Sequence, residues 1–317
     1  MPLSHPILGA GLARLKEDVE KSTGNALSIE IFDKAQMFGD AEVVGAVSSG
    51  KVKIGIAGSY HFAIRAPAVA ILDQPFLFNF PALVRAAATP GSEIRRVIDE
   101  TILANVGVRV LWWQGLGNNV FFSKGRDVAN LEHLKGQRVG VPGKALAELV
   151  ASCGGRATQI PFEVLHATMK GGGLDMAMGG ISAVQAFSLW QLTDTITRTL
   201  HVPVEFLLVI NERAWQALSQ AHRAAIADAA ASVELQMRER LSEMEAKMVA
   251  FAGSKGLKVR DLTPDQVVEW RACSAELLAG YMDKGGELAH KLMAAYGSLR
   301  TQPCCTTAPG AGVFTRR

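Results

Sequence analysis

The feature of this sequence that most limits its fold is one long amphipathic segment in the C-terminal third. From Ser219 to about Ala252, apolar residues recur in steps of mostly three and four, which predicts a single α-helix. The apolar positions are Ile226, Val233, Met237, Leu241, Met244, Met248 and Phe251. At 1.5 Å per residue such a helix is roughly 50 Å long, longer than one small domain is wide. We therefore expect two lobes, with this helix running across both.

The rest of the chain alternates short helices and short strands. Helices are predicted at 6–22, 41–49, 83–105 and 181–192, and strands at 27–32, 51–58, 108–115, 138–141 and 204–211. This alternation predicts an α/β fold with mixed, mainly parallel sheets. A segment with Gly115, Gly117, Asn118 and Asn119 follows one strand, and it is the predicted crossing between the lobes.

These elements predict a division of the chain. Residues 1–116 and 203–236 are expected to form lobe I, and residues 117–202 and 237–300 lobe II, with the helix at about 219–252 shared. Residues 301–317, TQPCCTTAPGAGVFTRR, are rich in Pro, Gly and Thr without a repeat, and they are predicted to be disordered.

Composition excludes several classes of protein. The net charge is only +3 and no long basic block occurs, so a nucleic-acid partner is not expected. No apolar run approaches the roughly 20 residues that span a bilayer. The four cysteines lack CxxC spacing, so neither a metal nor another cofactor is expected. Cys304 and Cys305 are adjacent in a polar tail, which argues against a disulfide framework, and Cys153 is interpreted as a buried structural thiol.

Catalytic patterns are also missing from the sequence. No G-x-S-x-G motif, no i,i+4 histidine pair and no evident pair of carboxylates occurs. The strand–turn–helix at RVGVPGKALAELV has a phosphate-loop look, but Gly143-Lys144 is followed by Ala145 rather than Ser or Thr. The start of the helix after Pro142 still offers free backbone N–H groups, which suit an anionic or polar ligand.

Two tryptophans end the strand at 108–115. Side chains of neighbouring strand residues point to opposite faces, so Trp112 is expected in the core. Trp113 could pack in the core or reach a cleft, and the sequence leaves both options open.

Four stretches together resemble the solute-binding proteins of TRAP transporters, the DctP-like family, over about residues 5–300. They are HPILGAGLARLKEDVEKSTGNALSIEIF, ILDQPFLF, LEHLKGQRVGVPG and IPFEVLHATMKGGGLDMA. Their order and spacing are more specific than any one of them. The resemblance implies a periplasmic, two-lobed binding protein that is not an enzyme. Such a protein captures a small organic acid in the cleft between its lobes, closes by a hinge, and delivers the acid to a membrane permease.

The sequence departs from the family pattern at three ligand-contacting positions. Gly140 stands where the family usually has the arginine that pairs with the ligand carboxylate, Gly117 where a second arginine often lies, and Gly179 near a common asparagine. An arginine clamp is a strong carboxylate site. Lys144, Arg138 and Arg156 are candidates to replace it, and the choice among them stays open.

The missing arginines predict a ligand that is bulkier or less acidic than a C4-dicarboxylate. The residues expected to line its site are Trp113, Gln114, Asn118, Asn119, Gly140, Lys144, Phe162 and Gly179. Trp113 and Phe162 would stack on the ligand, and the amide side chains would donate neutral hydrogen bonds.

The beginning of the chain is the second departure. The family has a signal peptide and a first strand before the His-Pro region, whereas His5-Pro6 comes almost at once here. Either the start is assigned too late or the chain is a truncated copy, and a missing strand would expose its neighbour as a new edge. The alternatives are a cytoplasmic α/β enzyme and a degenerate copy that no longer binds ligand. Whether the protein is a monomer or a homodimer stays open.

Overall fold

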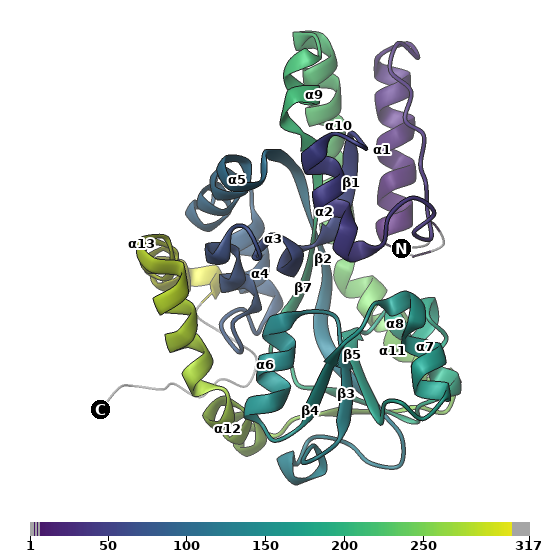
Figure 1. Cartoon of the computed structure of the whole chain (residues 1–317), viewed down its shortest axis with the longest axis vertical. Helices are drawn as coiled ribbons and strands as arrows, with labels where there is room; N and C mark the ends of the chain where they lie inside the picture. Colours follow the sequence, from purple (N-terminus) through teal and green to yellow (C-terminus); the bar gives the residue numbers. More distant parts are fainter. Residues whose placement is uncertain (1–2, 4, 6, 306–317) are drawn as a thin grey trace.

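The computed structural model describes residues 3, 5 and 7–305, and it confirms the two-lobed α/β fold. Figure 1 shows β2 (Val108–Ser123) and β7 (Pro203–Asn211) running through the centre, with one lobe above and one below. β2 belongs to the sheets of both lobes, because its first half pairs with β7 and its end pairs with β5 and β6.

Lobe I is built on an antiparallel sheet in the order β1–β7–β2, where β1 is Ile54–Gly58. Its shorter helices are α1 (Leu8–Ser22), α2 (Asp40–Ser49), α3 (Ser59–Phe62), the 3-10 helix η1 (Pro67–Asp73), α4 (Pro81–Ala88), α5 (Glu93–Val106) and α9 (Glu212–Ala217). One core packs between this sheet and α5, and a second packs between the opposite face of the sheet, α1 and α10.

Lobe II has a mixed sheet, in which β3–β4, β3–β5 and β6–β8 are parallel pairs and β2–β5 and β2–β6 are antiparallel. Its strands are β3 (Arg138–Val141), β4 (Arg156–Gln159), β5 (Met176–Gly180), β6 (Thr195–Arg198) and β8 (Lys258–Asp261). Its helices are η2 (Leu131–His133), α6 (Lys144–Ser152), α7 (Phe162–Lys170), α8 (Ala183–Ala186), η3 (Leu189–Gln191) and α12 (Pro264–Cys273).

The predicted crossing between the lobes lies inside a continuous strand. The register of β2 against β7 shifts between Gly115 and Asn118, and Gly117 has a φ of +83°. A bulge with a left-handed glycine bends a strand without ending it. The glycine-rich segment therefore turns β2 from one sheet into the other.

The long helix is divided into two consecutive helices. α10 (Gln220–Glu239) is followed by α11 (Leu241–Ser254), and they meet at Arg240, whose φ of −81° and ψ of −8° depart from helical values. α10 packs on β2 and α1, whereas α11 packs on α8 and β8. The pair spans both lobes, as expected, but with a break where β2 also bends.

The strand expected at 27–32 does not form. The backbone N–H of Ile29 donates to Glu20 of α1 at 2.9 Å, and its carbonyl accepts from Lys16. Strand-like alternation yields a strand only where a neighbouring strand can pair with it. Among the described residues, β1 has β7 as its strand neighbour on one side and none on the other, so it is an edge of the sheet.

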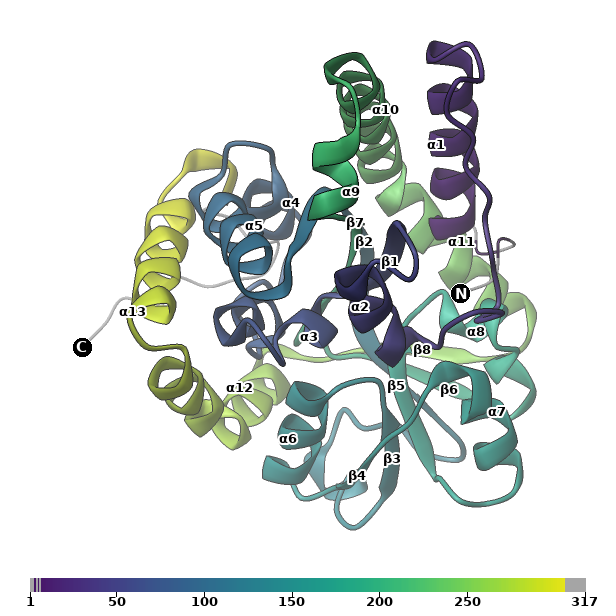
Figure 2. The ribbon, with the colours of Figure 1, turned by 45° about the horizontal axis from the view of Figure 1, so that its top comes forward.

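The C-terminal assignments also change. α13 (Ala275–Arg300), which breaks at Gly286, packs mainly against η1, α4 and α5 of lobe I, although it was assigned to lobe II (Figures 1 and 2). Tyr281 and Tyr296 donate their hydroxyls to lobe I carbonyls at 3.1 and 2.9 Å. The first residues of the tail predicted to be disordered are ordered instead, because η4 (Pro303–Cys305) packs on α4 and Cys305 is buried. Residues 306–317 lie outside the described residues.

A disulfide joins Cys153, at the end of α6, to Cys273, at the end of α12. The interpretation of Cys153 as a free buried thiol was wrong, because two cysteines 120 residues apart in sequence meet only in the fold. Such a bond is typical of oxidising compartments.

Replacing both Cys153 and Cys273 with alanine should lower the free energy of unfolding by about 2–4 kcal/mol, because the unfolded chain loses a long closed loop. Urea unfolding with and without a reducing agent measures this effect. The reducing agent should destabilise the wild type and leave the double variant unchanged. An insensitive wild type would contradict the bond.

Among the described residues, no helix combines the length and the apolar character needed to cross a bilayer.

Candidate functional site

A cavity lies between the lobes, at the place where β2 and β7 pass from one sheet to the other. It holds about 610 Å³, including space open to solvent. Lobe I and the crossing strands contribute His5, Ser59, Tyr60, Asp73, Leu116, Pro203, Val204, Glu205 and Phe206. Lobe II contributes Asn119, Pro142, Gly143, Ala145, Leu146, Phe162, Gly180, Ser182, Ala183 and Phe187. Because both lobes form its walls, a hinge motion would open and close it.

Tyr60 reaches from lobe I across to the start of α6. A Cβ atom on Gly143 would lie only 2.9 Å from the Tyr60 ring, so the ring packs directly on the backbone there. The Tyr60 hydroxyl donates to Asp40 at 2.9 Å, and His61 Nε2 lies 2.8 Å from the same carboxylate oxygen. Burial, followed by the charges of Asp40 and other carboxylates, raises the pKa of Tyr60 well above its usual value.

His5 links the lobes by a hydrogen bond. Its Nδ1 accepts the backbone N–H groups of Ile7 and Leu8 at the start of α1, so its proton must lie on Nε2. Nε2 therefore donates to Ser182 Oγ of lobe II at 3.1 Å. Burial lowers the pKa of His5 to about 4, so the ring is neutral at neutral pH.

Asp73 is one of the two acidic side chains among the described residues that line the cavity, and Glu205 of β7 is the other. Asp73 lies at the end of η1 and is 6% exposed, no hydrogen bond joins its carboxylate to another described residue, and its oxygens are not completely enclosed by protein. Burial raises its pKa to about 7. A buried carboxylate without a donor is costly, so this group is a natural acceptor for a donor from a ligand.

Phe162 and Phe187 form an aromatic wall on the lobe II side. Their rings are stacked, with centroids 5.0 Å apart. A Cβ atom on Gly179 would lie 2.8 Å from the Phe162 ring, so the ring occupies the space that a side chain at 179 would need. Of the residues expected at the site, Phe162 and Asn119 line the cavity and Gly179 makes room for its wall.

Trp113 and Gln114 lie elsewhere than expected. Trp113 is buried in the core beneath α5, where its indole N–H donates to Asp99 at 2.8 Å. The two tryptophans do face opposite sides of the strand, but both faces of the lobe I sheet are covered, so neither reaches the cavity. Gln114 is also buried, and its side-chain amide donates to the carbonyl of Gly115 at 2.9 Å.

The positions expected to supply or replace an arginine do not face the cavity either. Leu174, Leu165 and Ile160 fill the space around Gly140, where a Cβ atom would lie 2.7 Å from Leu174. Lys144 is mostly exposed and lies 3.8 Å from Glu148.

The other two candidate cations lie on the surface of lobe II. Arg138 is paired with Asp175 at 2.6 Å, and Arg156 is exposed on β4. None of the described residues that line the cavity is a lysine or an arginine.

A second cavity, of about 520 Å³ including open space, lies behind the crossing strands. Asn118 lines it, together with Glu205, Arg238 and Glu245. Position 117 has no room for a side chain there, because a Cβ atom on Gly117 would lie 2.0 Å from a Glu245 oxygen. Burial raises the pKa of Glu205 to about 7, and neither of its carboxylate oxygens has a hydrogen-bond partner among the described residues.

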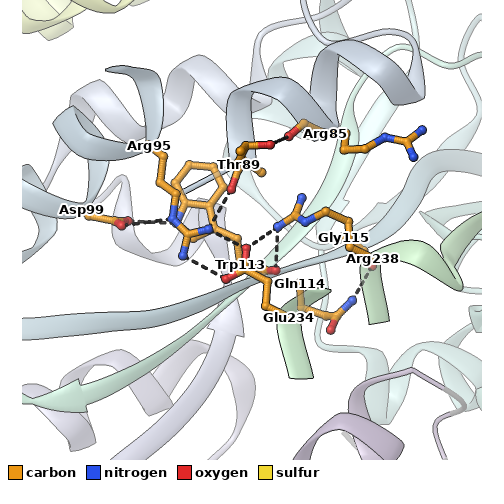
Figure 3. A network of polar contacts seen from close by, with 10 residues as sticks. Arg85, Thr89, Arg95, Asp99, Trp113, Gln114, Gly115, Glu234 and Arg238 are labelled. Carbon is orange, nitrogen blue, oxygen red and sulfur yellow. Dashed lines mark hydrogen bonds and ion pairs between the residues drawn. The ribbon is translucent and has the colours of Figure 1, made fainter. Parts of the chain in front are cut away.

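A buried ion network fixes α10 to lobe I just before the break at Arg240 (Figure 3). Arg95 of α5 donates two hydrogen bonds to Glu234 of α10, one of them at 2.9 Å. Arg238 donates to the same carboxylate and to the backbone carbonyl of Trp113 at 3.1 Å. The network therefore ties α10, α5 and β2 together next to the hinge.

Comparison with known proteins identifies the family. Residues 2–284 match the profile of "Bacterial extracellular solute-binding protein, family 7". The chain belongs to this family. It is 26% identical over 256 residues to a solute-binding protein of Verminephrobacter eiseniae, covering 80% of this chain and 75% of the relative. It is 20% identical to the sialic acid-binding periplasmic protein of Vibrio cholerae, covering 79% of this chain and 78% of the relative.

Solved structures share the fold of this family 7 protein. An extracytoplasmic solute receptor of Bordetella pertussis that binds pyroglutamic acid has a TM-score of 0.87 at 20% identity, covering 93% of this chain and 96% of the receptor. A TRAP periplasmic solute-binding protein of Chromohalobacter salexigens with bound D-glucuronate also has a TM-score of 0.87, at 19% identity, covering 94% of this chain and 97% of that protein.

In this family 7 protein, the most prominent polar groups of the cavity were not among the residues predicted from the sequence. His5, Tyr60, Asp73 and Ser182 come from four separate segments, so local motifs could not unite them. Asp73 alone carried a sequence signal, because an acidic residue interrupts the apolar run AVAILDQPFLFNF.

Proposed function

We propose that this protein is the solute receptor of a TRAP-type transporter and delivers a small organic solute to a membrane permease from the periplasm. Family membership and the cavity between the lobes support this function. The relatives named above bind carboxylated compounds, including sialic acid, D-glucuronate and pyroglutamic acid. We propose that the solute here also carries an acceptor group such as a carboxylate.

The backbone at the start of α6 is the proposed partner of that group. Gly143, Ala145 and Leu146 line the cavity, and no side chain caps this nine-residue helix. The first N–H groups of a helix have no partner within it, and the helix dipole favours negative charge there. Backbone N–H groups would thus donate some of the hydrogen bonds to the solute that the missing arginine would otherwise donate. The remaining expected residues, Asn119 and Phe162, would complete the site in lobe II.

A pair of variants at position 144 tests the backbone interaction. Lys144→Pro removes the first N–H of α6, and proline is tolerated at this helix position. Lys144→Ala removes the exposed side chain and keeps the N–H group. We expect the proline variant to lose on the order of 10- to 100-fold in affinity, and the alanine variant to bind like the wild type.

The measurement begins with a thermal-shift screen of sugar acids, keto acids, pyroglutamate and amino acids. A ligand at 100 times its Kd should stabilise the wild type by about 2.7 kcal/mol. Calorimetry with the compounds that stabilise it then compares the two variants. A wild type that no compound stabilises would contradict the receptor function. Equal affinities of the two variants would contradict the role of the α6 backbone alone.

A further inference from the structure

Asp73 has no role in the function proposed so far. Asp73 is 6% exposed on the lobe I wall of the cavity, and no hydrogen bond joins its carboxylate, which is not completely enclosed by protein, to another described residue. Buried polar groups in native proteins almost always have partners, so a group of this kind in a ligand cavity points to a donor on the ligand.

Two polar side chains of the same cavity already have partners for their protons. The hydroxyl proton of Tyr60 is donated to Asp40, and the Nε2 proton of His5 is donated to Ser182. No lysine or arginine occurs among the described residues that line the cavity. The charges of Asp40, Asp73 and Glu163 all act on Tyr60, in that order of strength, so several carboxylates surround this wall. A positive group would be attracted to it.

The two walls of the cavity therefore have opposite polarity. Lobe I presents an unpaired carboxylate, whereas lobe II presents the N–H groups at the start of α6. We infer that the cavity selects a zwitterionic solute of the amino-acid type, with its ammonium group on Asp73 and its carboxylate at the start of α6. This inference rests on the proposed receptor function and specifies the class of solute.

The remaining walls indicate the character of the side chain. Between the two polar ends lie the stacked rings of Phe162 and Phe187, together with Leu116, Val204 and Phe206. These surfaces are apolar, so burial of an apolar side chain would add to the affinity. Amino acids with a medium-sized apolar or aromatic side chain fit this arrangement better than sugar acids, whose many hydroxyl groups need polar partners.

Matched compounds test the inference directly. L-phenylalanine is compared by calorimetry with 3-phenylpropionate, which lacks the amine, and with 2-phenylethylamine, which lacks the carboxylate. L-leucine is compared with 4-methylpentanoate and 3-methylbutylamine in the same way. We expect at least one of the two amino acids to bind, and each of its truncated counterparts to bind on the order of tenfold or more weakly.

Two variants assign the effect to Asp73. Asp73→Asn should weaken binding of the amino acid on the order of 10- to 100-fold and leave the affinity of the deaminated acid nearly unchanged. Glu245→Gln is the control, because it neutralises a partly buried carboxyl group in the second cavity, away from the proposed site. This control should bind the amino acid like the wild type.

The pH dependence has a defined sign. Because burial raises the pKa of Asp73 to about 7, an ammonium ligand should bind more tightly as pH rises from 5 to 7 and level off above 7. The titratable groups around Asp73 do not reverse this trend, because His5 is already neutral and Tyr60 stays protonated in that range. Glu205, on the crossing strand, gains negative charge over the same range, so the Asp73→Asn variant is needed to isolate the Asp73 contribution.

Different results would contradict the amino-acid-type solute and the solute-receptor function. Deaminated acids that bind as tightly as the parent amino acids, or sugar acids that bind while the amino acids do not, would overturn the inference and leave the receptor function standing. Amines that bind as tightly as the amino acids would overturn the carboxylate half of it. Failure of every compound in both panels would count against the receptor function itself.

Discussion

Replacing Glu234 with glutamine is expected to lower the free energy of unfolding by about 3–5 kcal/mol. Glu234 is 4% exposed and receives hydrogen bonds from Arg95 and Arg238 (Figure 3). Glutamine keeps the shape of the side chain but removes the carboxylate that pairs with Arg238, and it leaves Arg95 with only the longer contact to Asp99 at 3.4 Å. Removing one partner of a buried ion pair strands the other charge in a poorly solvated place, which is why the expected loss is large.

An exposed ion pair on α5, the helix that carries Arg95, provides the control. Arg96 of α5 donates two hydrogen bonds to Glu100 at 2.9 Å, but the Glu100 side chain is 62% exposed. Glu100→Gln should therefore change stability by less than about 1 kcal/mol. Urea unfolding of both variants measures the contrast. Equal losses would show that burial does not decide the strength of these pairs.

The position of this network gives it a second consequence. It fixes α10 to β2 and α5 immediately before Arg240, where the long helix breaks, and close to the bend of β2 at Gly115 and Gly117. A rigid anchor on the lobe I side leaves the break and the bulge as the parts that can move. We therefore expect α10 and α11 to move relative to one another about Arg240 when the lobes close, rather than as one rod.

The architecture was predictable because it depends on periodicity and on glycine. The apolar spacing from Ile226 to Phe251 predicted an element that spans both lobes, and the glycines near 115–117 marked the crossing. The break at Arg240 was not predictable, because the apolar spacing continues through it. The strand predicted at 27–32 is absent for a similar reason, because a strand needs a pairing partner that its own sequence does not specify.

The site was harder to predict because its chemistry comes from distant segments. Asp73 and Tyr60 belong to lobe I, Ser182 and Phe187 to lobe II, and His5 joins them from the start of the chain. The family resemblance predicted a ligand contact at Gly140, but apolar side chains enclose this residue. None of the described residues that line the cavity is a lysine or an arginine, and the partners proposed for the solute are instead backbone N–H groups of α6 and the carboxylate of Asp73 on the opposite wall.

Asp73→Asn is expected to change the pH dependence of stability as strongly as any single substitution in the cavity. An aspartate has a pKa of about 3.9 in an unfolded chain, whereas burial raises the pKa of Asp73 to about 7 in the folded protein. Between these values the folded state binds more protons than the unfolded state, so the free energy of unfolding falls as pH rises through this window. For one group the loss totals roughly 3–4 kcal/mol by pH 8.

The variant should therefore gain stability relative to the wild type by roughly this amount between pH 4 and pH 8. Burial also raises the pKa of Glu205 and of Asp99, and their contributions have the same sign in both proteins, so they cancel in the difference. Asp283→Asn, at an exposed position on α13, is the control for the loss of one surface carboxyl group. Urea unfolding at several pH values measures all three proteins, and a pH-independent difference for Asp73→Asn would show that the carboxyl group is not destabilised by burial. At neutral pH the Asp73 carboxylate is expected to lower the stability of the protein without ligand, yet it lines the cavity. A positive group on a bound solute would compensate its charge, which would account for a destabilising carboxylate at this position.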